Sequence, residues 1–144
     1  MTSEKKILLF LVDDDALFLK SLEIDFMANT TCEIKTFATG EACLKNLTHN
    51  PDVIVLDYYL NGVNKHAING LVALDRIKAA NPQIPVIMLS SQDRIEVAVN
   101  CMKHQAFDYI VKSETAFLRL QKAITIIFHY QQMEKALSWY MEKM

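Results

Sequence analysis

Short apolar runs alternate along the chain with longer segments in which apolar residues recur at helical spacing. The apolar runs are rich in β-branched residues and predict strands at Lys6–Val12, Cys32–Phe37, Val53–Leu56, Val86–Leu89 and Asp108–Val111. The intervening segments predict helices at Ala16–Ala28, Glu41–Asn46, Leu71–Ala80 and Ile95–Lys103. After them, Glu114–Met144 contains neither Gly nor Pro and predicts one helix or two abutting helices.

The alternation of strands and helices predicts the fold class. The first, third and fourth predicted strands are apolar on both faces, so we expect them at the centre of a sheet that helices cover on each side. Cys32–Phe37 alternates in polarity instead, which indicates an edge strand. The pattern favours an α/β, doubly wound parallel sheet of five strands in the flavodoxin-like order 2-1-3-4-5, with an extended C-terminal helix.

Composition and charge narrow the class of protein. The 144 residues are 51% hydrophobic and 22% charged, with a formal net charge of −2, as in one globular domain. We assign residues 1–128 to this domain and residues 129–144 to a C-terminal helical extension. Lys and Arg are scattered, so we expect no direct DNA binding.

No apolar run is long enough to span a membrane, and Met1–Lys6 lacks the features of a signal peptide. The three Cys residues show no CxxC spacing, which argues against a disulfide or a thiolate metal site. We therefore expect a cytoplasmic protein with reduced thiols.

Polar residues follow four of the predicted strands, and parallel strands bring their carboxyl ends to one edge of the sheet. These residues are Asp13 and Asp14 after the first strand, Asp57 after the third, Ser90 after the fourth and Lys112 after the fifth. Three carboxylates in one cleft repel one another unless a cation is present, and hard oxygen ligands favour Mg²⁺. Such a site suits phosphoryl transfer, with Asp57 as nucleophile forming an aspartyl phosphate, Lys112 neutralising phosphoryl oxygens and Ser90 donating a hydrogen bond.

Each of these residues alone has a plainer explanation. An Asp after a strand is most often a helix N-cap, which is the role we assign to Asp15. Ser90 alone would be interpreted as a turn or cap residue, and Lys112 alone as a solvated surface lysine. The functional interpretation is favoured because these polar residues follow four strands whose carboxyl ends meet at one edge of the sheet.

The motifs together identify a family. They are Leu11-Val12-Asp13-Asp14-Asp15, Val55-Leu56-Asp57, Asn69-Gly70 opening a helix, Pro85-Val86-Ile87-Met88-Leu89-Ser90, and Ala106-Phe107-Asp108-Tyr109-Ile110-Val111-Lys112. Over roughly residues 5 to 128, the sequence resembles the chemotaxis-regulator-like receiver domain of two-component response regulators. The resemblance implies a cytoplasmic signal-transduction phosphoprotein, not an enzyme, apart from slow loss of its own phosphoryl group.

The resemblance also implies a role for each matching residue. Asp57 would accept a phosphoryl group from a histidine kinase or phosphotransfer protein, and Lys112 would contact the phosphate. The metal ligands for Mg²⁺ would be Asp14, Asp57 and the Tyr59 backbone carbonyl, with Asp13 acting mainly through water. Ser90 and Tyr109 would form a switch that reshapes the surface of helix 95–103, strand 108–111 and the helix that follows. A homodimer through that surface is one expectation.

The chain departs from the family pattern beside the acceptor. Gly70 lies thirteen residues after Asp57, where the family has a Gly about eight residues on, so Gly62–Ile68 form an inserted loop bracketed by Asn-Gly pairs. The loop is either a tolerated surface insertion or a determinant of partner choice or phosphoryl lifetime. Bulky Tyr59 would shield the acyl phosphate.

Lys112 is followed by Ser113, where the family commonly has Pro in a cis peptide. Because a cis bond before a non-proline residue costs about 2.5–4 kcal/mol, we predict a trans bond and a slightly displaced Lys112.

The last segment carries two apolar stripes. The first consists of Phe117, Leu120, Ile124 and Ile127 and is expected to pack on the sheet. The second consists of Ile126, Tyr130, Met133, Leu137, Tyr140 and Met144, with a/d-like spacing. This stripe would join two chains through the C-terminal helix, lead as a linker to an output domain, or fold back.

One enzyme class remains as the alternative. A haloacid-dehalogenase-like phosphohydrolase would use Asp13 as nucleophile in a DxD motif that Asp15 completes. Against it, Ala16-Leu17 replace the usual residues after that motif, and Asp57 would have no role. The sequence does not name the kinase, stimulus or output.

Overall fold

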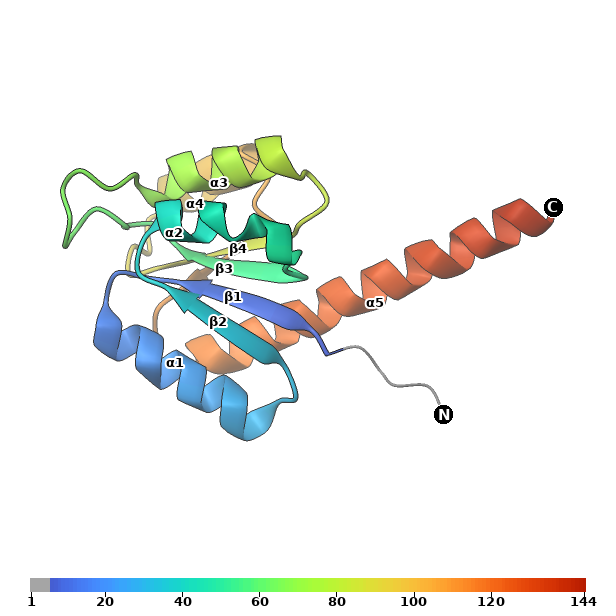
Figure 1. Ribbon diagram of the computed structural model, residues 1–144, viewed down its shortest axis with the longest axis horizontal. Coiled ribbons are helices and arrows are strands. Elements are labelled where there is room, and N and C mark those ends of the chain that lie inside the picture. The colour runs from blue at the N-terminus through green and yellow to red at the C-terminus, as the bar shows by residue number, and fades with distance from the viewer. Residues whose placement is uncertain (1–5) are drawn as a thin grey trace.

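The computed structural model describes residues 6–144, which form a five-stranded parallel sheet with helices on both faces (Figure 1). The strands are β1 (Leu8–Val12), β2 (Glu33–Phe37), β3 (Val53–Asp57), β4 (Val86–Ser90) and β5 (Asp108–Val111). Their order is β2-β1-β3-β4-β5. The predicted fold class and the edge position of β2 are therefore confirmed.

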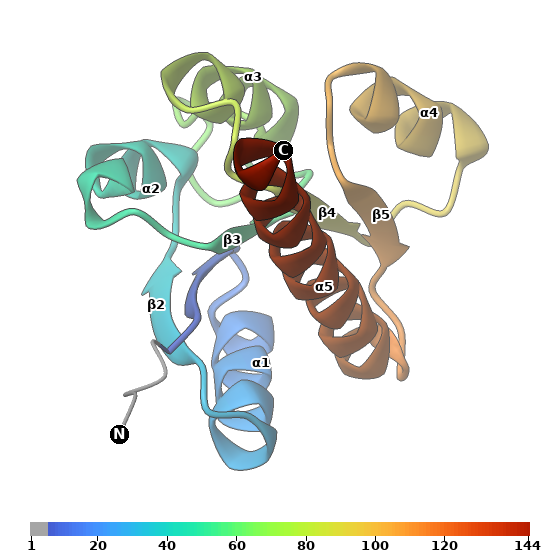
Figure 2. The same cartoon turned by 90° about the vertical axis from the view of Figure 1, so that its right-hand side faces the viewer.

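Side-chain alternation along the strands divides the core into two halves. Phe10, Ile54 and Met88 face one side, where α2 (Gly40–Lys45), α3 (Gly70–Ala80) and α4 (Ile95–Lys103) cover the sheet. Leu9, Val55 and Ile87 face the other side, against α1 (Ala16–Asn29) and α5 (Ala116–Lys143). Figure 2 shows these two layers of helices on opposite faces of the sheet. A short 3₁₀ helix, η1 (Leu47–His49), follows α2.

The predicted bounds of α4 and β5 match the structure, and those of the other predicted elements differ by one or two residues, as is usual at element ends. β1 begins at Leu8 rather than Lys6, and its pairing with β3 starts with Leu9 opposite Val53. Just before this pair, the Asp52 side chain accepts the Leu8 N–H at 2.8 Å. Residues 1–5 lie outside the described residues. They include the start of the predicted domain and most of Met1–Lys6, for which the sequence predicts no signal peptide.

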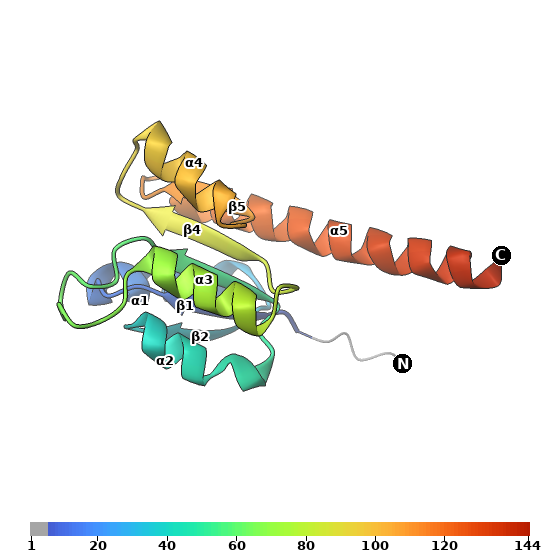
Figure 3. The ribbon, with the colours of Figure 1, turned by 90° about the horizontal axis from the view of Figure 1, so that it is seen from above.

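The C-terminal segment is one continuous helix, α5, which crosses the expected boundary at residue 128 without a break. Its last buried residue is Ile127. Figures 1 and 3 show its second half extending beyond the sheet, at the end opposite the loop between β3 and α3. Within residues 6–144, no helix is both long and apolar enough to cross a membrane.

Candidate functional site

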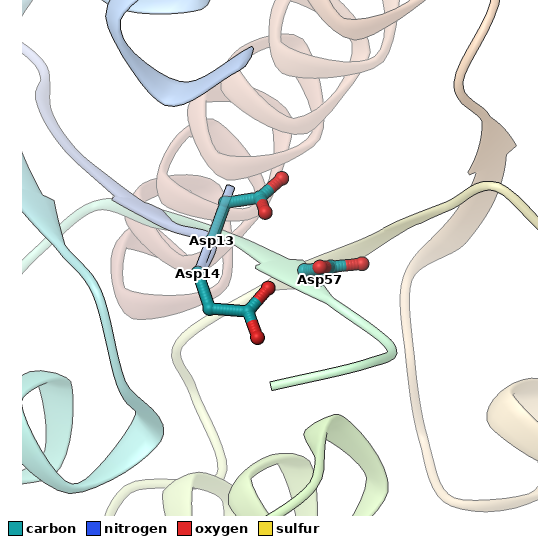
Figure 4. Close-up of side chains that lie close together, drawn as sticks. All are labelled: Asp13, Asp14 and Asp57. Carbon is teal, nitrogen blue, oxygen red and sulfur yellow. The ribbon is translucent and has the colours of Figure 1, made fainter. Parts of the chain in front are cut away.

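Three carboxylates meet at the carboxyl ends of β1 and β3. Asp13 and Asp14 follow Val12 directly, and Asp57 is the last residue of β3. One carboxylate oxygen from each of the three lies within 4.8 Å of the others. Figure 4 shows them close together at the edge of the sheet. The part of the predicted convergence that concerns the three carboxylates is thus present in the structure.

Burial makes this acid cluster electrostatically costly. Asp13 is 3% exposed and Asp57 is 4% exposed. Burial, together with the charge of Asp13, raises the pKa of Asp57 from its ordinary 3.8 to about 7, although Lys112 pulls it down. Two buried like charges are stable only when a cation compensates them.

Lys112 supplies part of that compensation. Its Nζ lies 2.8 Å from Asp13 Oδ2 and 3.5 Å from Asp57 Oδ2. Burial lowers the pKa of Lys112, but the two carboxylates outweigh this effect and hold it above its usual range. One ammonium thus faces two buried carboxylates, which leaves the cluster short of positive charge.

Two local contacts fix the position of Lys112. Its backbone N–H donates to the Ser90 carbonyl at 2.7 Å, and its Nζ lies 4.5 Å from the centre of the Phe18 ring. The sequence did not indicate Phe18, because a phenylalanine on a helix is ordinarily a core residue. No cis peptide occurs in residues 6–144, so the predicted trans bond between Lys112 and Ser113 is confirmed.

The donor set fits a hard divalent cation. Its ligands would be the carboxylate oxygens of Asp13, Asp14 and Asp57, and Lys112 is the cation that the structure places against the two buried ones. One ammonium does not balance three carboxylates, so the cluster gains free energy from a further cation. The Tyr59 N–H lies 3.4 Å from Asp57 Oδ1. The Tyr59 carbonyl as a metal ligand stays a prediction.

Asp14 and Asp15 make different contacts from Asp13. The Asp15 side chain accepts the Phe18 N–H at 3.1 Å and caps α1, which confirms its predicted role. Asp14 is only half-buried, and its Oδ2 accepts the Gly62 and Val63 N–H groups of the inserted loop at 3.0 and 3.1 Å. This contact was not predictable from the sequence, since the partners of Asp14 are backbone amides far along the chain.

Ser90 and Tyr109 are joined through Gln92. The fully buried Ser90 accepts the Gln92 N–H on its Oγ at 3.1 Å, and the Tyr109 hydroxyl donates to the Gln92 carbonyl at 2.6 Å. The two residues predicted as a switch therefore hold the same short segment between β4 and α4. The switch itself stays a prediction.

Gly70 brings the start of α3 against the acceptor strand. Its N–H donates to the Tyr58 carbonyl at 2.9 Å, and a Cβ at this position would lie 2.7 Å from Tyr58 Cα and collide with the Asp57 carbonyl oxygen. Only glycine permits this approach. The Asn69-Gly70 pair thus holds the end of the loop between β3 and α3 close to the backbone that follows Asp57.

The chain is similar in sequence to known proteins of one family. Residues 9–125 match the family model of the response regulator receiver domain. The DNA-binding transcriptional regulator NtrC of Escherichia coli (strain K12) is 31% identical over 133 residues, which are 89% of this chain and 26% of NtrC. The nitrogen assimilation regulatory protein NtrX of Azorhizobium caulinodans is 31% identical over 103 residues, 71% of this chain and 22% of NtrX. The chain spans about a quarter of the length of these curated relatives.

Solved structures agree on the fold. The signal receiver domain of a putative Luxo repressor protein from Vibrio parahaemolyticus superimposes with a TM-score of 0.79 at 19% identity, covering 92% of this chain and 98% of that one. The BeF3-activated DrrB receiver domain gives a TM-score of 0.70 at 26% identity, covering 84% of this chain and 99% of that one.

Proposed function

The chain belongs to the response regulator receiver family, and on this premise we propose that Asp57 is its phosphoacceptor. The phosphoryl donor is a histidine kinase or a phosphotransfer protein, and the reaction depends on Mg²⁺. The observation that carries the proposal is the position of Asp57, at the end of β3, clustered with Asp13 and Asp14 and 3.5 Å from Lys112.

The chemistry follows from the residues present. A carboxylate oxygen of Asp57 attacks the phosphorus, so an O–P bond forms while the P–N bond to the donor imidazole breaks. The leaving imidazole keeps the electron pair of the broken bond and takes up a proton. Lys112, already beside Asp57, neutralises an oxygen of the transferred group.

Asp13, Asp14 and Asp57 would hold the metal, with the Tyr59 carbonyl as a further ligand. When bound, Mg²⁺ supplies charge stabilisation for the phosphoryl oxygens. Burial and the charge of Asp13 raise the pKa of Asp57 to about 7, and a divalent cation beside Asp57 would lower it and favour the deprotonated nucleophile.

The response is a change of the surface formed by α4, β5 and α5. Ser90 and Tyr109 both hold Gln92, so movement of the Ser90 hydroxyl toward a phosphate releases one of the two bonds to that segment. Such a switch shifts the population between two preexisting states. The domain is a cytoplasmic signalling component rather than an enzyme, with slow loss of its phosphoryl group.

A second copy of this chain is the proposed partner of the exposed stripe on α5. Tyr130, Met133, Leu137 and Tyr140 are 58%, 65%, 62% and 63% exposed, although their spacing places them on one face. Apolar side chains in an a/d pattern are complementary to the same pattern on another helix. Residues 129–144 are the proposed helical extension of the domain at residues 1–128. The stripe therefore favours a homodimer through this extension over a homodimer through the surface that α4, β5 and the first half of α5 form on the domain. We propose no direct DNA binding by this chain.

Incubation with acetyl phosphate, followed by intact-mass measurement, tests the phosphoacceptor proposal. We expect one phosphoryl group on the wild type and on Asp15→Asn in the presence of Mg²⁺, and none on Asp57→Asn or in chelator. Labelling that survives Asp57→Asn and is lost in Asp13→Asn would instead support the phosphohydrolase alternative.

A further inference from the structure

The inserted loop, residues 62–68, reaches back to the metal-binding end of β1. The Gly62 and Val63 N–H groups donate to Asp14 Oδ2 at 3.0 and 3.1 Å, across 48 and 49 positions of sequence. Figures 1 and 3 show this loop, between β3 and α3, protruding at the edge of the sheet where the strands end. A loop that only bulged into solvent would have no reason to meet this carboxylate.

The loop is also fixed at its other end. The Ile68 N–H donates to Glu41 Oε2 on α2 at 3.1 Å, and Ala67 is 8% exposed. Inside the loop, Asn64 accepts the His66 N–H on its side chain and the Ala67 N–H on its carbonyl, both at 3.0 Å. The amides of Gly62 and Val63 are therefore presented by a folded segment with two anchors.

Both amides select the same oxygen of Asp14. Both bonds go to Oδ2, so the loop fixes the orientation of the Asp14 carboxylate. Partners that hydrogen-bond a metal ligand orient it, and their loss typically weakens metal binding about 10–100-fold. Asp13 and Asp57 are held by burial, whereas the half-buried Asp14 lacks that restraint.

We propose that Gly62 and Val63 are positioning residues for the magnesium site, acting through Asp14. The loop orients the one acidic side chain that the core does not hold, and magnesium binding in turn steadies the loop. This inference rests on the proposed magnesium-dependent function of the same site. A Cβ at Gly62 would lie 3.2 Å from Asp14 Oδ2, so the small residue permits the approach.

The first test needs no metal. The chain has only three Gly residues, so the Gly62 amide signal is readily assigned in ¹H–¹⁵N spectra of the full protein. Asp14→Asn should shift the Gly62 and Val63 amide protons upfield, because they lose a charged acceptor. Asp15→Asn should leave both unmoved. Equal spectra for Asp14→Asn and wild type would overturn the contact and the proposal with it.

The second test measures magnesium affinity by calorimetry. Deletion of residues 63–67 should weaken Mg²⁺ binding about 10–100-fold, while Lys65→Ala, a change within the same loop away from Asp14, should bind as the wild type does. Unchanged or tighter binding by the shortened protein would overturn the inference and leave the proposed function standing. A wild type that binds no Mg²⁺ would overturn both.

Discussion

The two ends of the molecule carry opposite kinds of unfavourable surface. Where the strands end, carboxylates are buried together; along the second half of α5, at the opposite end, apolar side chains are exposed (Figure 1). Both arrangements reduce the stability of the isolated chain, and each is relieved by a different occupant. On the proposed function, a divalent cation and a phosphoryl group would relieve the first, and a second copy of α5 would relieve the second. At both ends, the proposed binding site coincides with a surface that is unfavourable in the isolated chain.

The largest effect is expected from Asp14→Ala at the acidic end. Loss of a direct ligand should weaken Mg²⁺ binding by more than about 100-fold, the upper range for losing an indirect partner. Phosphorylation from acetyl phosphate should then be lost. Asp15→Asn is the matched control, because Asp15 only caps α1, and it should change neither quantity. Equal losses in the two variants would show that Asp13, Asp14 and Asp15 act only through their summed negative charge, without separate roles.

At the other end, Leu137→Glu combined with Tyr140→Glu should raise the dimer dissociation constant by about 100-fold or more, because two apolar contacts become charged. Gln132→Glu combined with Ser138→Glu adds the same charge off the stripe and should leave association unchanged. Sedimentation analysis over a concentration series measures both. A wild type that stays monomeric at every concentration would contradict the assignment of a second copy.

A smaller effect is expected from Asp57→Asn on stability without divalent cations. The pKa of Asp57 is raised from 3.8 to about 7, so its contribution to stability is complete below pH 4 and is lost as the pH rises to 7. Asn carries no charge, so the variant should unfold at a higher temperature than the wild type at pH 8, by about 3 °C for each kcal/mol gained.

The same measurement at pH 5 is the control for this effect. The difference between Asp57→Asn and the wild type should shrink there, and adding Mg²⁺ at pH 8 should shrink it too. A difference that does not depend on pH would mean that burial of Asp57 carries no electrostatic cost.

The smallest effect concerns the switch. Tyr109→Phe removes the hydroxyl that donates to the Gln92 carbonyl and should lower the free energy of unfolding by about 1 kcal/mol. Tyr130→Phe, on the exposed part of α5, should lower it by much less. Denaturant titrations compare the two. Equal values would show that the bond to Gln92 does not hold the β4–α4 segment.

The contrast between the ends also marks how far the sequence could predict the molecule. The strand order and the meeting of Asp13, Asp57 and Lys112 were predictable, because apolar runs place their following residues at one edge of a parallel sheet. The cap at Asp15 was predictable for the same local reason.

Contacts that depend on loop conformation were not predictable. The amides that hold Asp14 belong to Gly62 and Val63, and backbone N–H groups leave no residue-specific trace in a sequence. The ring of Phe18 beside Lys112 looks like an ordinary core position. The continuity of α5 was left open because no breaker separates its two stripes, a pattern that fits one helix as well as two.

The central claim is that the acidic end exists to receive a phosphoryl group on Asp57. The most direct test is to phosphorylate the protein with acetyl phosphate and Mg²⁺, reduce it with borohydride, which converts an aspartyl phosphate to homoserine, and locate the converted residue by peptide mass spectrometry. We predict conversion at position 57 alone. Conversion at position 13 or 14, or in none of the three, would contradict the account.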